Sequence, residues 1–542
     1  MDNPDFIIVG AGSAGCVMAE RLSASGRHKV LVLEAGGDDR RFYIQMPLGY
    51  GKTFFDPKVN WMYRAEPDPG LAGNVDHWPR GRVLGGSSSI NAMVWIRGAR
   101  ADFDDWRAAG NPGWGADEMC TAFREIECAV IGDDAQRGRS GPLNLFVPDK
   151  TVHPLTLKWF EAAQTLGLPF NPDFNGADQE GVGLFEFTIH KGRRLSAARA
   201  FLRPAMKRPN LRVIKGAQVT GLSFDGTRVT GVSYRRGGRT VEIKAGREVI
   251  LSGGAVNSPQ LLQVSGIGPA AHLTDLGIKV RLDNTNVGRN LEDHVGFNYT
   301  YRAKCKTLNQ DLRPWWGKVR AGLQYLLTRG GPLSVSLNQA GGFFRTGPAQ
   351  DRPNIQLYFQ ALSTVLPRPG ERPILSPDPW PGFSIGCSNC RPKSRGEIMI
   401  RSSDPREAPR ISPNALSHED DVRELLETGK FIRKMAATSP LADFIESEIL
   451  PGPKVIDDEA MIEDLRRRSG TVYHPVGTCR MGPDPAAAVV DPRLRVHGVG
   501  GLRVVDCSVF PNIVTGNTNA AAIATAWRAS ELVLEDAGQV AS

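Results

Sequence analysis

Apolar residues near the N-terminus fall into two short runs that predict buried strands. Residues 6–9 read Phe-Ile-Ile-Val, and residues 30–33 read Val-Leu-Val-Leu. Continuous aliphatic runs of this length are typical of parallel strands that are covered on both faces. Residues 13–23, which lie between the two runs, are predicted to form a helix. The order strand, helix, strand predicts a βαβ unit and therefore an α/β fold.

Beyond this unit the pattern predicts three further strands, one hairpin turn and two helices. The strands are expected where apolar residues alternate with polar ones or run together, and the turn is expected at a Gly-Gly pair. In chain order these elements are 211–214, 219–222, the turn at 237–238, 249–251, and the helices 419–437 and 520–526.

Length and composition limit the class of protein. A chain of 542 residues exceeds what one hydrophobic core usually serves, so we expect two domains. With 41% hydrophobic and 23% charged residues the composition is that of an ordered globular protein. No apolar run reaches the ~18 residues that a membrane-spanning helix needs. The first strand begins without the basic segment of a secretory signal, so a cytoplasmic location is expected.

Charge and cysteine content exclude two further classes. The net charge is +8, but the basic residues are dispersed and no block of five occurs, so nucleic acid is not an expected partner. Eight cysteines in a chain of this length do not form a disulfide framework. Cys387 and Cys390 lack a second pair and a neighbouring histidine. No metal site is therefore expected.

The turn after the first strand carries a dinucleotide-binding motif, Gly10-Ala-Gly12-Ser-Ala-Gly15. Gly10 allows the tight turn, Gly12 lets the backbone approach a pyrophosphate, and Gly15 permits close packing of helix and strand. The helix N-terminus favours the phosphate charges. Glu34 ends the second strand, where a carboxylate accepts hydrogen bonds from ribose hydroxyls. The motif predicts an adenine dinucleotide and leaves open whether it is NAD or FAD.

A second glycine-rich segment, residues 81–91, is followed by an ordered-looking run at residues 92–95. One interpretation is a surface loop. The other is a second backbone cradle along an extended cofactor, in which amide groups meet phosphate and flavin.

Several motifs together resemble the glucose–methanol–choline (GMC) oxidoreductases. The resemblance covers residues 5–534 and is closest to bacterial FAD-dependent dehydrogenases of alcohols, L-sorbose and polyethylene glycol. It implies an α/β fold with a Rossmann-like FAD-binding domain and a discontinuous α+β substrate domain. The segments that carry it are 81–104, 254–268, 287–294, 391–396, 402–405, 474–482 and 505–519.

The resemblance implies a division of the chain and a set of cofactor-binding residues. The FAD-binding domain would comprise residues 1–150, 195–300 and 465–542, and the substrate domain residues 151–194 and 301–464. Ile90 stands where some relatives carry the histidine that attaches FAD covalently, so FAD is expected to be non-covalent. The expected FAD-binding residues are Gly10, Gly12, Ser13, Ala14, Gly15, Glu34, Ala35, Arg82, Leu84, Gly85, Gly86, Ser87, Asn91, Ala92, Met93, Val94, Val219, Tyr473, Asp506, Cys507, Asn517 and Thr518.

His474 and Asn519 are the expected catalytic residues. Oxidation of an alcohol by hydride transfer needs a base for the hydroxyl proton, and an imidazole serves near neutral pH. In relatives with a His/Asn pair, the positions of His474 and Asn519 act as the base and as a hydrogen-bond donor that positions the substrate oxygen. His294 is expected to be structural, and the histidines at 77, 190, 272 and 418 are expected to be ordinary core or surface residues.

The expected activity is oxidation of an alcohol to an aldehyde or ketone, with electrons passing to a quinone or another acceptor rather than to O2. The substrate would be a sugar or polyol such as L-sorbose, or a primary alcohol. Alternatives are an oxygen-using alcohol oxidase, a choline dehydrogenase, and a non-redox lyase or decarboxylase on the same fold. Gln339 stands where choline-oxidising relatives tend to have an acid. Residues 315–327 form an amphipathic basic segment that is a candidate for peripheral contact with a membrane, on its cytoplasmic side.

Overall fold

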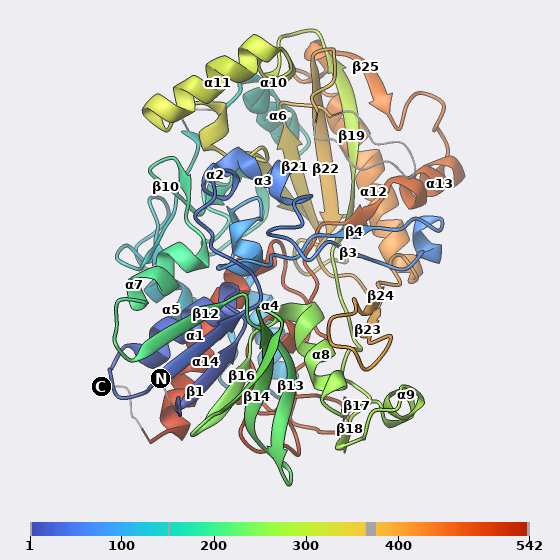
Figure 1. The fold of residues 1–542 in the computed structure, drawn as a ribbon. Coiled ribbons are helices and arrows are strands. Elements are labelled where there is room, and N and C mark those ends of the chain that lie inside the picture. Colours follow the sequence, from blue (N-terminus) through green and yellow to red (C-terminus); the bar gives the residue numbers. More distant parts are fainter. Residues whose placement is uncertain (1–2, 150–151, 365–375, 539–542) are drawn as a thin grey trace.

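A computed structural model describes residues 3–149, 152–364 and 376–538 of the chain, in which two sheets form the cores (Figure 1). The first sheet is parallel, and its inner strands are completely buried, with Ile7, Ile8 and Val32 fully inaccessible. Its strand order is β12 (Leu211–Lys215), β2 (Val30–Glu34), β1 (Phe6–Val9), β16 (Glu248–Leu251) and β27 (Leu502–Val504).

Helices and a small antiparallel sheet cover the first sheet. Helix α1 (Ser13–Ser23) packs against α14 (Thr518–Asp536), which in turn contacts α5 (Ala116–Ile126). Strand β14 (Arg228–Arg236) contacts β16 and lies between β13 (Gln218–Asp225) and β15 (Arg239–Lys244). This packing holds the end of β1 and the start of α1 in place, and the glycine motif that is expected to bind the cofactor lies between them.

The second sheet has seven strands and lies in the upper half of Figure 1. Helices α6 (Pro154–Thr165), α12 (Glu419–Ala436) and α13 (Asp458–Arg468) pack against its strands. The order is β25 (Ile445–Leu450), β19 (Val295–Ala303), β22 (Gly382–Asn389), β21 (Ile355–Gln360), β20 (Ala340–Phe344) and β8 (Gly181–Leu184), with β26 (Gly470–Thr471) paired to β19.

The remaining elements connect and flank the two sheets. Two of them are long helices, α8 (Gly254–Val264) and α11 (Trp315–Thr328), and α4 (Arg100–Ala108) packs against α5. The shorter ones are α2 (Phe42–Gln45), α3 (Tyr50–Thr53), α7 (Arg203–Ala205), α9 (Ala270–Asp275), α10 (Leu308–Leu312), β3 (Tyr63–Arg64), β4 (His77–Trp78), β5 (Val94–Trp95), β6 (Glu127–Cys128), β7 (Leu143–Asn144), β9 (Glu186–Phe187), β10 (Ile189–His190), β11 (Arg193–Arg194), β17 (Ile267–Gly268), β18 (Leu282–Asp283), β23 (Glu397–Met399) and β24 (Arg410–Ser412).

The structure confirms the elements that the sequence pattern predicts. The βαβ unit is present as β1, α1 and β2, and the predicted strands are β12, β13 and β16. Gly237 and Gly238 form the turn between β14 and β15, with φ angles of +55° and +81° that suit a type I′ hairpin. The predicted helix at 520–526 is part of the longer α14.

The division into two domains remains a prediction, although most strands of each sheet lie within the segments expected for one domain. All strands of the first sheet lie in the segments assigned to FAD binding. Of the second sheet, β19 begins before residue 300 and β26 lies after residue 465, so these two strands cross the expected boundaries. The boundary at residues 150 and 151 lies outside the described residues.

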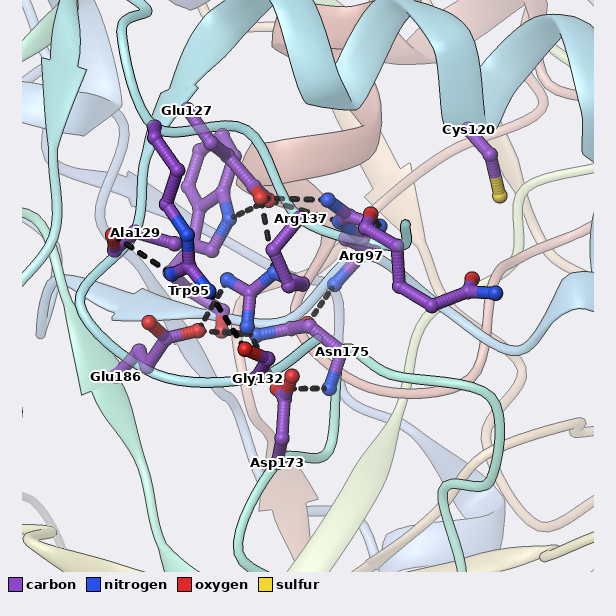
Figure 2. Close-up of polar contacts among 12 residues, drawn as sticks. Trp95, Arg97, Cys120, Glu127, Ala129, Gly132, Arg137, Asp173, Asn175 and Glu186 are labelled. Atoms are coloured by element: carbon purple, nitrogen blue, oxygen red, sulfur yellow. Dashed lines mark hydrogen bonds and ion pairs between the residues drawn. The ribbon is translucent and has the colours of Figure 1, made fainter. Parts of the chain in front are cut away.

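A buried cluster of charged residues joins the first 150 residues to the segment that follows (Figure 2). Arg137 is fully buried and contacts three carboxylates, those of Glu127 at 3.0 Å, Asp173 at 2.6 Å and Glu186 at 2.5 Å. Arg97 contacts Glu127 as well, at 2.5 Å. The cluster contacts β5 at Trp95, which pairs with Glu186 of β9 and donates a hydrogen bond from its Nε1 to Glu127. It thus supports a strand that reaches the cavity described next.

None of the helices in the described ranges is long and apolar enough to cross a membrane.

Candidate active site

A large cavity extends between the loops of the first sheet and the strands of the second. Its volume is about 1260 Å³, above the range of roughly 300–1,000 Å³ that is usual for one small ligand. Gly10, Gly12 and Ser13 line one part, and Phe297 and Tyr358 of the second sheet line another. The space suits an extended cofactor together with a substrate.

The first glycine motif forms the turn that the sequence predicts. Gly10 has a φ of +100°, and a Cβ there would lie 2.5 Å from the carbonyl oxygen of Ser252. A Cβ on Gly15 would lie 2.0 Å from the carbonyl oxygen of Gly10, so the helix packs directly on the turn. Glu34 accepts hydrogen bonds from the backbone N–H groups of Ala11 and Gly36, at 2.8 and 2.7 Å. Burial raises the pKa of Glu34 to about 7.

The second glycine-rich segment is not a surface loop but packs against the first glycine motif, so the interpretation as a cradle for the cofactor stays open. It is largely buried, and a Cβ on Gly86 would lie 2.7 Å from the Cα of Gly12. The N–H of Gly85 donates to the carbonyl oxygen of Ala11 at 2.7 Å. The two glycine motifs therefore touch, which only residues without a side chain permit at this point.

Most of the expected FAD-binding residues line the cavity, and four do not. Gly15, Leu84 and Gly85 support the turns from behind, and the Arg82 guanidinium stacks 4.8 Å from the centre of the Trp61 ring. Those that line the cavity are Gly10, Gly12, Ser13, Ala14, Glu34, Ala35, Gly86, Ser87, Asn91, Ala92, Met93, Val94, Val219, Tyr473, Asp506, Cys507, Asn517 and Thr518.

His474 reaches the cavity from a loop that neighbouring side chains hold in place. Asp293 Oδ1 accepts the backbone N–H of His474 at 2.8 Å, and Arg80 donates to the carbonyl oxygen of Tyr473 at 2.7 Å. Tyr473 has a φ of +71°, a strained value for a residue of this size. Burial, with smaller effects from His294 and Arg80, lowers the pKa of His474 well below its usual value. The imidazole is therefore neutral at physiological pH and available as a base.

The structure pairs His474 with Asn517, and it places Asn519 elsewhere. Asn517 Nδ2 lies 3.1 Å from His474 Nε2. Asn519 Oδ1 instead accepts a hydrogen bond from Ser13 Oγ at 2.7 Å, at the glycine turn. The catalytic role expected of Asn519, which also lines the cavity, stays a prediction, although the side chain that lies against His474 is that of Asn517, two positions earlier. The physical reason is that Asn517 precedes α14 in extended conformation, whereas Asn519 lies in its first turn and points along another direction.

His294, which we expected to be structural, is in direct contact with His474. The two Nδ1 atoms are 3.0 Å apart and the rings meet edge to face at 89°. His294 Nε2 lies 3.0 Å from the carbonyl oxygen of Cys390. The sequence held a weak signal for this residue, because residues 287–294 belong to a motif of their own.

Comparison with known proteins defines the family. The profile of the N-terminal part of GMC oxidoreductases matches residues 4–296, and that of the C-terminal part matches residues 392–526. The chain belongs to the GMC oxidoreductase family, whose members are flavin enzymes.

Individual relatives resemble the chain over nearly its whole length. It is 41% identical over 535 residues to an alcohol dehydrogenase (acceptor) of Pseudomonas putida, covering 98% of this chain and 95% of the relative. It is 40% identical over 531 residues to an oxygen-dependent choline dehydrogenase of Rhizobium etli, with the same coverage of 98% and 95%.

Solved structures share the fold. Pyridoxine 4-oxidase from Mesorbium loti matches with a TM-score of 0.87 and 32% identity, over 98% of this chain and 99% of that one. A formate oxidase variant of Aspergillus oryzae, studied for FAD modification, matches with a TM-score of 0.90 and 25% identity, over 99% and 98%. The touching glycine turns, the buried Glu34 and the size of the cavity fit the FAD that the family binds.

Proposed function

We propose that the protein oxidises an alcohol with His474 as the base and Asn517 as the group that orients the substrate oxygen. The observation that carries this proposal is the distance of 3.1 Å between His474 Nε2 and Asn517 Nδ2, at the wall of a cavity that continues to the glycine turns. FAD, when bound, supplies the acceptor for the hydride.

The two side chains have different roles at the substrate hydroxyl: His474 removes its proton and Asn517 donates a hydrogen bond to its oxygen. His474 Nε2 takes the hydroxyl proton, because the neutral imidazole has its one unprotonated nitrogen there; the lone pair accepts from Asn517 in the absence of substrate and turns to the hydroxyl when the alcohol binds. Asn517 has a second N–H on Nδ2, which donates to the substrate oxygen and stabilises negative charge on it. Gln356 Nε2 donates to Asn517 Oδ1 at 3.2 Å, so the amide nitrogen is the atom that faces His474.

FAD is held without a covalent bond in this proposal. Ile90 is buried and offers no nucleophile at the position next to Asn91. Ser13, Glu34, Gly86 and Ser87 would hold the nucleotide part, and the residues from Asn91 to Val94 with Thr518 would contact the flavin. Precipitation with acid tests this point, since non-covalent flavin leaves with the supernatant.

Primary alcohols with an apolar body suit the far part of the cavity better than sugars. The cavity lining includes five leucines from several elements that belong to one packed cluster, namely Leu48, Leu312, Leu333, Leu337 and Leu362. A sugar would leave several hydroxyl groups without partners against such a wall. The alcohol dehydrogenase among the relatives is named for a general acceptor rather than for oxygen, and on this likeness we propose a quinone or other non-oxygen acceptor.

Choline is the second candidate, because choline dehydrogenases are nearly as similar to the chain as the alcohol dehydrogenase. The Gln339 side chain does not line the cavity, whereas Asp76 does. Burial raises the pKa of Asp76 to about 6, so it carries a negative charge at neutral pH and above. Asp76 is therefore the carboxylate that would meet a quaternary ammonium group.

Anaerobic mixing of the yellow protein with single alcohols distinguishes these candidates. The panel comprises octan-1-ol, L-sorbose, benzyl alcohol and choline. We expect octan-1-ol to bleach the flavin band, with slow return of colour when air is admitted. Bleaching by choline alone would favour the second candidate, fast return of colour would identify an oxidase, and no bleaching by any alcohol would overturn the proposal in favour of non-redox chemistry.

Contact with an anionic lipid surface is part of the proposal and rests on α11. The helix turns its buried residues, Gly317, Ala321 and Tyr325, inward, and an apolar stripe outward. Lys318 and Arg320 flank the stripe, and the helix has no acidic residue. Phe42 and Tyr43 of α2 extend the patch, with the Phe42 ring 6.3 Å from that of Tyr325. The exposed members on α11 are Trp315, Trp316, Val319, Leu323, Leu326 and Leu327.

Apolar patches of this extent with basic flanks are typical of helices that lie in a lipid interface. Sedimentation with vesicles tests the contact. We expect binding to phosphatidylglycerol vesicles that the double variant Leu323→Ser/Leu327→Ser loses, while Leu157→Ser on α6, a site about as exposed as Leu323, retains it. Equal binding by all three proteins, or a dimer of the wild type that the double variant dissociates, would overturn it.

A further inference from the structure

A row of hydrogen bonds crosses the site from the carbonyl oxygen of Cys390 to the hydroxyl of Tyr358. It passes through two histidines and two amides whose polar atoms lie within hydrogen-bond distance of one another. The steps are Cys390 O to His294 Nε2 at 3.0 Å, His294 Nδ1 to His474 Nδ1 at 3.0 Å, His474 Nε2 to Asn517 Nδ2 at 3.1 Å, Asn517 Oδ1 to Gln356 Nε2 at 3.2 Å, and Gln356 Oε1 to Tyr358 Oη at 2.8 Å.

The direction of every bond in this row follows from its first atom. A carbonyl oxygen only accepts, so His294 Nε2 carries the proton. His294 is fully buried and burial lowers its pKa to about 4, against smaller opposing effects of the Cys390 and Val514 backbone groups, so the ring is neutral. With the proton on Nε2, its Nδ1 has a lone pair. His474 Nδ1 must then donate, which leaves Nε2 of the neutral His474 ring without a proton.

The other end of the row agrees with this arrangement, because the Tyr358 hydroxyl can donate. Tyr358 Oη donates to Gln356 Oε1, so Gln356 presents its amide nitrogen to Asn517 Oδ1. Asn517 consequently presents its own amide nitrogen to His474 Nε2. Because both ends agree, one tautomer of His474 satisfies every group in the row.

We infer that His294 is a positioning residue that fixes His474 in the Nδ1–H tautomer, and that Gln356 performs the same task from the side of Asn517. This inference rests on the proposed function in that His474 Nε2 acts as the base. The reversed tautomer would place two N–H groups against each other at Asn517 and two lone pairs against each other at His294. It would also present a donor to the substrate hydroxyl where an acceptor is needed.

Nitrogen NMR of the FAD-loaded protein with 15N-labelled histidine tests the tautomer directly. The signals of His474 are assigned by their loss in His474→Gln. We expect a protonated Nδ1 and an unprotonated Nε2 in the wild type. A protonated Nε2 would overturn the inference whether or not the protein oxidises alcohols, and this readout is therefore separate from the proposed function.

Variants at His294 test the consequence for the reaction. His294→Leu removes the acceptor for His474 Nδ1–H, and we expect flavin reduction by substrate to slow about 10- to 100-fold with little change in KM. His294→Asn offers a side-chain oxygen near the place of Nδ1, and we expect it to restore most of the rate and the Nδ1–H signal. Loss of rate in both variants with an unchanged tautomer would show a merely structural role and contradict the inference.

Two further variants are needed, one as a control and one as a second test of the inference. His272→Leu removes a histidine whose Nε2 also contacts a backbone oxygen, that of Ile400 at 3.0 Å, outside the cavity, and should behave as the wild type. Gln356→Leu removes the orienting group at the other end of the row, so it serves if His294→Leu fails to fold. We expect it to scramble the His474 tautomer; an unchanged tautomer and rate would count against the inference.

Discussion

Ser13 Oγ donates a hydrogen bond to Asn519 Oδ1 at 2.7 Å, although 506 positions separate the two residues. Ser13 begins α1 and Asn519 lies in the first turn of α14, so this bond joins the N-termini of two helices at the wall of the cavity. Both N-termini bear partial positive charge. Their joint position suits the anionic centre of a dinucleotide, and we therefore expect Asn519 to act in cofactor binding rather than in chemistry.

Substitution of the two asparagines should therefore have different effects. Asn517→Ala removes the donor to the substrate oxygen, and we expect flavin reduction to slow about 100-fold while FAD remains bound. Asn519→Ala should leave the rate of reduction within a few fold and weaken FAD binding. Stopped-flow reduction and titration of apoprotein with FAD measure the two quantities. The reverse assignment of effects would show that Asn519 is the partner of His474 after all.

Removal of the base should affect chemistry and spare the cofactor. We expect His474→Ala to lower the rate of flavin reduction by about 10²- to 10⁴-fold, the range for loss of a general base. The flavin spectrum should remain that of the bound cofactor. Anaerobic stopped-flow with the best alcohol of the panel measures the rate. Turnover near that of the wild type would contradict the assignment of the base.

Because the two glycine motifs touch, a single methyl group added at Gly86 is expected to weaken FAD binding strongly. Gly86→Ala places a Cβ 2.7 Å from the Cα of Gly12 at a φ of +51°, so the two turns must move apart. We expect FAD to bind about 10- to 100-fold more weakly, the equivalent of about 1–3 kcal/mol of overpacking. Gly37→Ala is the control, because a Cβ there has no neighbour within 4 Å. Equal affinity in both variants would show that the turns do not hold the nucleotide.

The sequence predicted the parts of the site that depend on local pattern. The glycine turn, its helix and Glu34 lie within one βαβ unit, so spacing alone indicates their arrangement. The contact between His294 and His474 has no such signal. It arises because β19 pairs with β26, where Val472 N–H donates to the carbonyl oxygen of His294 at 3.0 Å. A pairing between strands that are distant in the chain leaves no periodicity in the sequence.

That Asn517 rather than Asn519 lies against His474 has a different physical cause. Both residues lie in one short polar segment, and the motif does not reveal at which residue the helix begins. Asn517 lies before the first turn of α14 with φ −67° and ψ 130°, and Asn519 lies within that turn. A shift of two residues across a helix start changes the direction of the side chain, so only the structure distinguishes the two.

The buried cluster of Figure 2 predicts how stability depends on pH. Its two arginines face three carboxylates, so one proton among the carboxylates makes the cluster neutral. Arg97, the first charge partner of Glu127, lowers the pKa of Glu127 against the effect of burial, whereas burial raises the pKa of Glu186 to about 7. Glu186 is therefore the residue that holds the proton.

A folded-state pKa above the ordinary value means that the folded protein binds this proton more tightly than the unfolded chain. The free energy of unfolding therefore falls as the pH rises from about 4.5 towards 7, by about 3 kcal/mol for this group. Glu186→Gln removes the titration, so its melting temperature should fall less between pH 5.5 and 8 than that of the wild type. Glu459→Gln, at an exposed site on α13, should keep the dependence of the wild type. Calorimetry at both pH values measures this difference, and identical slopes for Glu186→Gln and the wild type would mean that Glu186 is ionised in the folded protein.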